Sequence, residues 1–216
     1  MKKVEIQITQ TFEEHPTDVL KFLLGKTLDC IYTLNMPTDS DLLRNSTAVD
    51  AVHEKLYFKT TDGLKYEMMS EEYTEDYYID MKKSTIKSVE QVESEFKEFQ
   101  LPIKFFIHKI FIFSLVQPIS AEKWHIESIY SEKWHSKKRQ IKFKEEFYPD
   151  VYTGQVSEDS HLVFVNDKDE YLAIGTQLAP YFTITTNQPY INDFFTGESW
   201  IKEGVPSPYK LSRTID

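Results

Sequence analysis

The stretch His161–Thr176 reads HLVFVNDKDEYLAIGT. Two apolar runs, 161–165 and 170–176, flank Asn166-Asp167-Lys168-Asp169, four polar residues of the kind that form tight turns. Short apolar runs on either side of such a turn are typical of a β-hairpin. A calcium loop of the EF-hand type would need a glycine and a distal glutamate at set positions, and both are missing. The stretch therefore predicts two antiparallel strands joined by a turn, without a metal.

The extended pattern continues through most of the second half of the chain. Further strands are expected near 103–117, 124–130, 138–147 and 181–186. The chain has 3 Trp, 13 Tyr and 15 Phe but only 6 Gly, and aromatic rings suit a pleated, half-buried surface. In the first half, Asp62-Gly63 predicts a second hairpin, because this pair readily takes the positive φ values of tight turns.

Two helices are expected in the N-terminal half. The first follows Pro16-Thr17-Asp18 and stops at Gly25, with its apolar side formed by Val19, Leu20, Phe22, Leu23 and Leu24. The second begins at Ser88 with the form of a capping box and must end before Pro102, and its apolar residues are spaced 3, 4 and 3 apart: Val89, Val92, Phe96 and Phe99.

These elements predict an α+β fold: a many-stranded antiparallel or mixed sheet, two helices in the N-terminal half and a β-dominated C-terminal half. We expect residues 1–216 to form a single compact domain with a possible subdivision near 100–103, where the chain is short, apolar and unlike a linker. The prolines and glycine of 204–208 predict an irregular C-terminal tail over 197–216.

The chain is acidic, with 35 Asp and Glu against 25 Lys and Arg and a net charge of -10. Such a charge disfavours nucleic acid and anionic membrane surfaces as partners. Cys30 is the only cysteine, so no internal disulfide can form, and a small buried hydrophobe is its expected role. The N-terminal residues alternate like a strand and show no export signal, so a cytoplasmic location is expected.

The tetrapeptide Glu-Lys-Trp-His occurs twice, at 122–125 and 132–135. Histidines ten residues apart do not match a zinc-ligand spacing, and a helix would leave the two copies about 80° apart. In extended chain the even spacing puts Trp124 and Trp134 on one side and His125 and His135 on the other. We interpret the tryptophans as sheet core or sheet edge, with an aromatic contact surface as the alternative.

The sequence carries no recognised catalytic signature: no nucleophile elbow, phosphate-binding glycine loop or zinc-protease motif. We therefore expect no catalytic residues, no cofactor and no metal, and predict that the protein is not an enzyme.

Residues 67–80 read EMMSEEYTEDYYID, with six carboxylates, three tyrosines and no basic residue. Tyrosine is enriched at protein interfaces, and clustered carboxylates attract a basic partner. An ordinary acidic hairpin with its tyrosines packed on the sheet is the simpler interpretation. The functional interpretation is a docking face for a basic protein, formed by Glu71, Glu72, Tyr73, Glu75, Asp76, Tyr77, Tyr78 and Asp80.

The resulting hypothesis is a non-enzymatic, acidic protein-binding protein. Its most concrete form is a bacterial immunity or inhibitor protein that neutralises a basic toxin or nuclease by covering the active cleft. The first alternative is a β-rich protein that binds a small molecule or lipid in an aromatic cavity lined from 103–134. The second is an unrecognised hydrolase.

Overall fold

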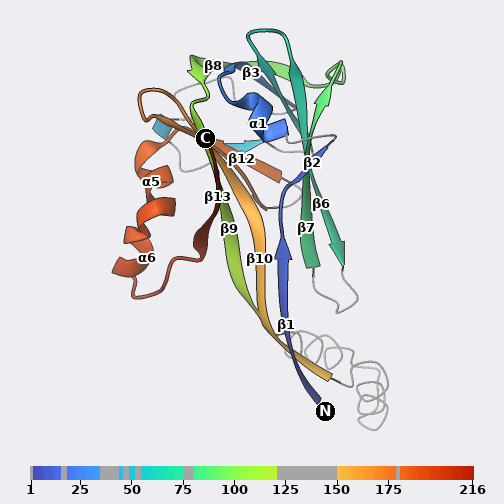
Figure 1. The fold of residues 1–216 in the computed structure, drawn as a ribbon, viewed down its shortest axis with the longest axis vertical. Helices are drawn as coiled ribbons and strands as arrows, with labels where there is room; N and C mark the ends of the chain where they lie inside the picture. Colours follow the sequence, from blue (N-terminus) through green and yellow to red (C-terminus); the bar gives the residue numbers. More distant parts are fainter. Residues whose placement is uncertain are drawn as a thin grey trace.

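Two β-sheets packed face to face form the body of the protein (Figure 1). The computed structural model describes residues 2–15, 19–34, 44–45, 49–51, 55–74, 80–120, 150–178 and 181–216. The N-terminus lies at one end of the molecule, at the start of β1, and the C-terminus lies toward the other end, after β13.

The first sheet has seven strands and is built around β10, which is 16 residues long. Its path runs β13-β9-β10-β11-β12-β4, and β1 pairs in parallel with the first half of β10, from Lys2↔Asp150 to Gln10↔Glu158. β11 takes over the same edge of β10 from His161 onward. The strands are β1 (Lys2–Gln10), β4 (Val49–Ala51), β9 (Lys109–Ser120), β10 (Asp150–Val165), β11 (Tyr171–Leu178), β12 (Tyr181–Thr185) and β13 (Tyr209–Ile215).

The second sheet has six strands in the order β2-β7-β6-β5-β3-β8. The short β2 pairs in parallel with β7, and the other neighbours are antiparallel. Because β2 follows β1 after two residues, the chain passes from one sheet to the other at 11–12. The strands are β2 (Glu13–His15), β3 (Thr27–Thr33), β5 (Lys55–Thr60), β6 (Lys65–Thr74), β7 (Asp80–Val89) and β8 (Lys97–Phe106).

Both hairpins predicted from turn residues are confirmed. The stretch 161–176 forms the end of β10, a turn and most of β11, with Asp169 at φ 58°. The Asn166 side-chain oxygen accepts hydrogen bonds from the backbone N–H of Lys168 and of Glu170, which fixes this turn. Gly63 has φ 88° in the turn between β5 and β6.

The main hydrophobic core lies between the two sheets. Phe58 of the six-stranded sheet is fully buried, stacks on Tyr66 at 5.3 Å between ring centroids and meets Phe164 of the other sheet at 6.3 Å. A second core lies on the opposite face of the seven-stranded sheet, under α5 (Gln188–Thr196), and contains Phe113, Val163, Ile191 and Phe194. β10 is therefore buried on both faces around 161–165.

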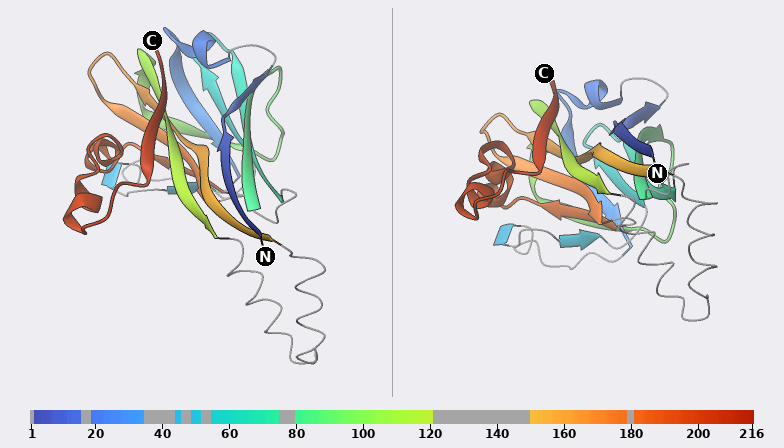
Figure 2. Two further views of the ribbon diagram at one scale, coloured as in Figure 1. Left: turned by 60° about the horizontal axis from the view of Figure 1, so that its bottom comes forward. Right: turned by 90° about the horizontal axis from the view of Figure 1, so that it is seen from below.

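The helices are few, and they lie differently from the prediction. The first predicted helix is confirmed as α1 (Val19–Leu23), followed by Gly25 at φ 74°. The other two described helices of five residues or more, α5 and α6 (Glu198–Lys202), are C-terminal. Figure 2 shows them on the side of the seven-stranded sheet that faces away from the six-stranded sheet.

The predicted α+β fold with two N-terminal helices is wrong, because the molecule is dominated by strands in two mainly antiparallel sheets. No helix spans 88–99: β7 ends at Val89, an irregular segment follows, and β8 begins at Lys97. Phe96 packs edge-on against Tyr57 on the outer face of the sheet, whereas Phe99 belongs to the core between the sheets. The 3-4-3 spacing therefore reflects a turn between two strands and not one helical face.

Two other segments also differ from their predicted form. The single strand expected over 103–117 is divided at Ile107–His108 between β8 and β9, which belong to different sheets. Pro102 lies within β8, an edge strand, where the missing N–H is tolerated. The tail expected to be irregular contains α6 and the edge strand β13, which pairs with β9.

Candidate functional site

The predicted docking residues belong to the β6–β7 hairpin. Glu71, Glu72 and Tyr73 lie in β6, and Asp80 is the first residue of β7. The other four predicted residues, Glu75, Asp76, Tyr77 and Tyr78, lie outside the described residues. One hairpin thus carries the whole predicted set, on its two strands and on the segment that joins them.

The outer part of this hairpin extends beyond the rest of its sheet. β5 pairs with β6 only as far as Met69, and β2 pairs with β7 only over Thr85–Lys87. From Ser70 and Ser84 outward, the two strands pair with each other and with no other described strand (β6 and β7 in Figure 1, to the right of β1). The hairpin is therefore a two-stranded ribbon whose backbone edges are open among the described elements.

The strand register places lysine positions opposite three of the acidic positions of β6. Glu67 lies opposite Lys87, Glu71 opposite Lys83 and Glu72 opposite Lys82. For the first of these pairs the side chains form an ion pair, with 2.7 Å between Glu67 Oε1 and Lys87 Nζ. Directly opposed positions on antiparallel strands are close enough for opposite charges to attract. Asp80 is the first described residue of β7 and lies opposite Thr74 in this register, and the sequence places two further carboxylates, Glu75 and Asp76, between the two strands.

At the base of the hairpin, Glu67 contributes to a buried polar site on the outer face of the six-stranded sheet. The neighbouring Tyr57 is almost fully buried beneath Phe96, with 4.8 Å between ring centroids. Burial raises the pKa of the Tyr57 hydroxyl, and the carboxylates of Glu67 and Glu93 raise it further. Lys55 pairs with Glu93 at 2.5 Å. Glu67 is paired with Lys87 and Glu93 with Lys55, so each carboxylate of this site has a counter-ion. These contacts hold the base of the hairpin in place.

A second buried polar group lies at a bulge in β10 and was not predicted. The register with β9 shifts between Asp159 and His161, which leaves Ser160 without a partner across the ladder. The His161 ring packs against Phe194 at 4.6 Å and Tyr209 at 5.4 Å, and its Nδ1 lies 3.0 Å from Ser160 Oγ. The sequence signal is five polar residues in succession, Ser157 to His161, inside a strand.

Although Asp, Ser and His are adjacent here, their geometry is not that of a catalytic triad. Asp159 accepts hydrogen bonds from Ser114 Oγ at 2.8 Å and from the Phe12 backbone N–H, so its carboxylate is engaged on the face away from the helix. Ser160 Oγ donates to the Phe113 carbonyl. All three side chains are buried, whereas a nucleophile must reach its substrate. The group holds the fold together at the point where β10 changes neighbours.

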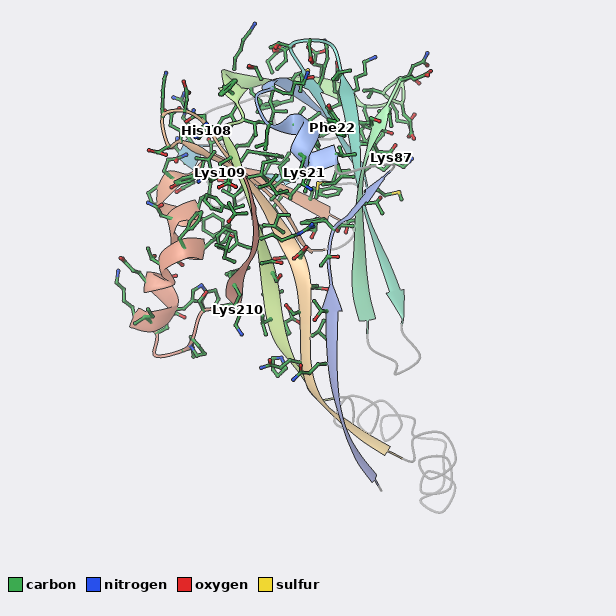
Figure 3. All side chains as sticks on the ribbon, viewed as in Figure 1. Lys21, Phe22, Lys87, His108, Lys109 and Lys210 are labelled. Atoms are coloured by element: carbon green, nitrogen blue, oxygen red, sulfur yellow. The ribbon has the colours of Figure 1, made fainter. Side chains whose placement is uncertain are left out.

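Two cavities open on the described surface. One of about 490 Å³ is bordered by the β10–β11 turn, by Lys104 and Phe105 of β8 and by the start of α5. The other, of about 620 Å³, lies between α1 and the β5–β6 turn and has exposed apolar residues, Phe22 and Leu64, at its rim (Figure 3 labels Phe22). An aromatic cavity was expected to be lined from 103–134, of which the structure describes 103–120. In this described part, Phe105 reaches the smaller cavity, whereas Ile107, Ile110 and Ile112 pack in the core.

The doubled Glu-Lys-Trp-His segment and the strands predicted at 124–130 and 138–147 lie outside the described residues. Within the described part of the chain, no cluster of three or more His, Cys, Asp or Glu side chains is placed to hold a metal ion. No described helix combines the length and the apolar character needed to cross a bilayer.

No protein-family model matches the chain, and no characterised protein or solved structure is significantly similar to it. Function is therefore argued from the residues and their arrangement.

Proposed function

We propose that the protein binds a basic protein partner through the outer part of the β6–β7 hairpin. In its most concrete form it is a bacterial immunity or inhibitor protein that acts in the cytoplasm and covers the active cleft of a basic toxin or nuclease. The observation that carries the proposal is the extension of this hairpin beyond its sheet, as a two-stranded ribbon with which no other described strand pairs.

A narrow ribbon has the shape needed to enter a cleft, and its sequence supplies the complementary charge. The strand register places lysine positions opposite Glu71 and Glu72, whereas residues 75–80 contain three carboxylates and no basic residue. Tyr73, Tyr77 and Tyr78 add contact area at a small cost in side-chain entropy. An acidic tip on a protein of net charge -10 accelerates association with a basic partner and keeps nucleic acid away from the same surface.

The test is capture of the partner from the cells that make this protein, followed by its identification and by measurement of binding rates with the purified pair. We expect a basic partner whose association rate constant falls by about tenfold or more between low and high salt, because exposed charges are screened. A tip variant with Glu75→Lys, Asp76→Lys and Asp80→Lys should lose capture while it unfolds at the same denaturant concentration as the wild type.

A matched variant controls for net charge: Glu95→Lys, Glu198→Lys and Glu203→Lys change it equally at exposed positions away from the hairpin tip. This variant should keep most of the capture. Capture that is equal in the tip variant and the wild type, or lost equally in both variants, contradicts the proposed docking site. If the captured partner is not a toxin or nuclease with an active cleft, the proposed role as an inhibitor is contradicted, but the proposed docking site is not.

A further inference from the structure

The cavity of about 490 Å³ beside the β10–β11 turn gathers positive charge on an acidic protein. Its wall includes the cationic residues Arg44, Lys104 and Lys168 and the apolar surfaces of Phe105 and Pro189. These residues come from four separate segments of the chain, so the fold and not a local run of basic sequence brings them together.

The three cations of this wall form no direct ion pair with a described carboxylate. Lys26, Lys55 and Lys87 elsewhere on the molecule each lie within 2.7 Å of a carboxylate oxygen. By contrast, no ion pair joins Arg44, Lys104 or Lys168 to any carboxylate among the described residues. Two carboxylates also line the cavity, Asp167 and Glu170, and Glu170 already accepts a hydrogen bond from Asn166 Nδ2 at 2.7 Å. Unpaired cations around a concave surface favour an anionic ligand.

The walls are held in place by side-chain to backbone hydrogen bonds. The buried Asn166 accepts from the N–H of Lys168 at 2.9 Å and from that of Glu170 at 2.8 Å. Beside the turn, Gln188 holds the backbone of Tyr171: its Oε1 accepts from the Tyr171 N–H and its Nε2 donates to the Tyr171 carbonyl, both at 2.9 Å. A site whose walls are fixed before binding loses less conformational entropy when the ligand arrives.

The start of α5 contributes to the same wall through Gln188 and Pro189. The positive end of the helix dipole therefore adds to the field of the three cations. His108 and Lys109, labelled in Figure 3, flank the same end of the sandwich, since the His108 N–H donates to the carbonyl of Val165, the residue before Asn166.

We propose that this cavity binds a small organic phosphate. A phosphate group carries up to two negative charges and matches several monovalent cations, and an arginine can bind two of its oxygens at once. The volume exceeds that of a phosphate group, which leaves room for an organic moiety against Phe105 and Pro189.

Isothermal titration calorimetry at low salt tests this proposal, with adenosine monophosphate, inorganic phosphate and uncharged adenosine as probes. We expect adenosine monophosphate to bind more tightly than inorganic phosphate, and adenosine to bind very weakly. The double variant Lys104→Gln/Lys168→Gln should weaken binding of both phosphates by about tenfold, because it removes two of the three cations that line the cavity.

The matched control is Lys202→Gln/Lys210→Gln, which removes two exposed positive charges from α6 and β13 (Lys210 is labelled in Figure 3). It should leave phosphate binding within about twofold of the wild type. The site is overturned if neither phosphate binds up to about 10 mM, if the cavity variant binds as well as the wild type, or if the control loses as much affinity. The tip variant of the hairpin should keep phosphate binding, so the two proposals fail separately.

Discussion

The carboxylate of Asp159 accepts a hydrogen bond from the backbone N–H of Phe12, 147 residues away in the sequence, at 3.1 Å. Arg213 completes this arrangement: its Nη2 lies 3.5 Å from Asp159 Oδ2 and donates to the Phe12 carbonyl oxygen at 3.5 Å. Both backbone polar groups of Phe12 are therefore satisfied by side chains, just where the chain passes from β1 to β2. This contact fixes the crossing between the two sheets.

Replacing Asp159 by alanine should lower the free energy of unfolding by about 2–4 kcal/mol, since it leaves the Phe12 N–H and Ser114 hydroxyl without their buried acceptor and Arg213 without its counter-ion. Urea denaturation followed by tryptophan fluorescence measures the change. Asp167→Ala, at an exposed turn position, is the control and should have little effect. A loss below about 0.5 kcal/mol for Asp159→Ala would show that the crossing does not depend on this carboxylate.

Gly175 lies opposite His161 in the β10–β11 ladder, and a Cβ at this position would be 2.5 Å from His161 Nε2 and from Thr183 Oγ1. Gly175→Ala should therefore destabilise the protein by about 1–3 kcal/mol through overpacking. In a His161→Ala background the same substitution should be less harmful, because one of the two clashing side chains has gone. Thermal or urea unfolding of the four variants gives the coupling. Additive effects would contradict the close approach of these two residues.

Asp62 links acid stability to the β5–β6 turn. The Lys26 ammonium, and then the Thr60 hydroxyl, lower the pKa of Asp62 from 3.8 to about 2. Because the folded state holds this carboxyl proton less tightly than the unfolded state, the resulting stabilisation is complete above pH 3.8 and disappears as the pH falls towards 2. Asp62→Asn should flatten the pH dependence of the urea midpoint within this window only. An NMR titration of Asp62 with an ordinary pKa would contradict the expectation.

Cys30 is fully buried, and burial raises the pKa of its thiol. The thiolate is the reactive form, so a thiol reagent such as dithionitrobenzoate should modify the native protein at least about 100-fold more slowly than the unfolded protein. The time course of absorbance in buffer and in concentrated urea measures both rates. Equal rates would mean that β3 opens readily and that the thiol is not held in the core.

Local signals predicted the turns of this fold better than its long-range order. Asp62-Gly63 and Asn166 to Asp169 specify hairpins by themselves, because turn conformation is a property of adjacent residues. The prediction of a helix beginning at Ser88 is wrong because Phe96 and Phe99 pack on opposite faces of the sheet. Their positions depend on contacts with Tyr57 and with the main core, which the spacing of apolar residues does not reveal.

The charge of the candidate docking face is another property that the sequence alone does not determine. Residues 67–80 contain no basic residue, yet Lys82, Lys83 and Lys87 follow closely, and only the hairpin register shows which carboxylates they oppose. The role of Asp159 was beyond prediction, because it requires Phe12 and Arg213 to be brought to it from opposite ends of the chain. The cavity cations come from separate segments in the same way.

The parallel pairing of β1 with β10 sets the order in which the molecule can be completed during synthesis. β1 leaves the ribosome before the other described strands, but its partner positions, 150–158, are made almost 150 residues later. At about 5–20 residues per second, β1 waits roughly 7–30 s before its ladder can form. All strands of the six-stranded sheet have been synthesised once Phe106 is made, so this sheet can assemble in the meantime. The exception is β2, because it follows β1 directly. β1 is thus made before the other described strands but is among the last of them to be paired, and until then its backbone is open to pairing with other nascent chains.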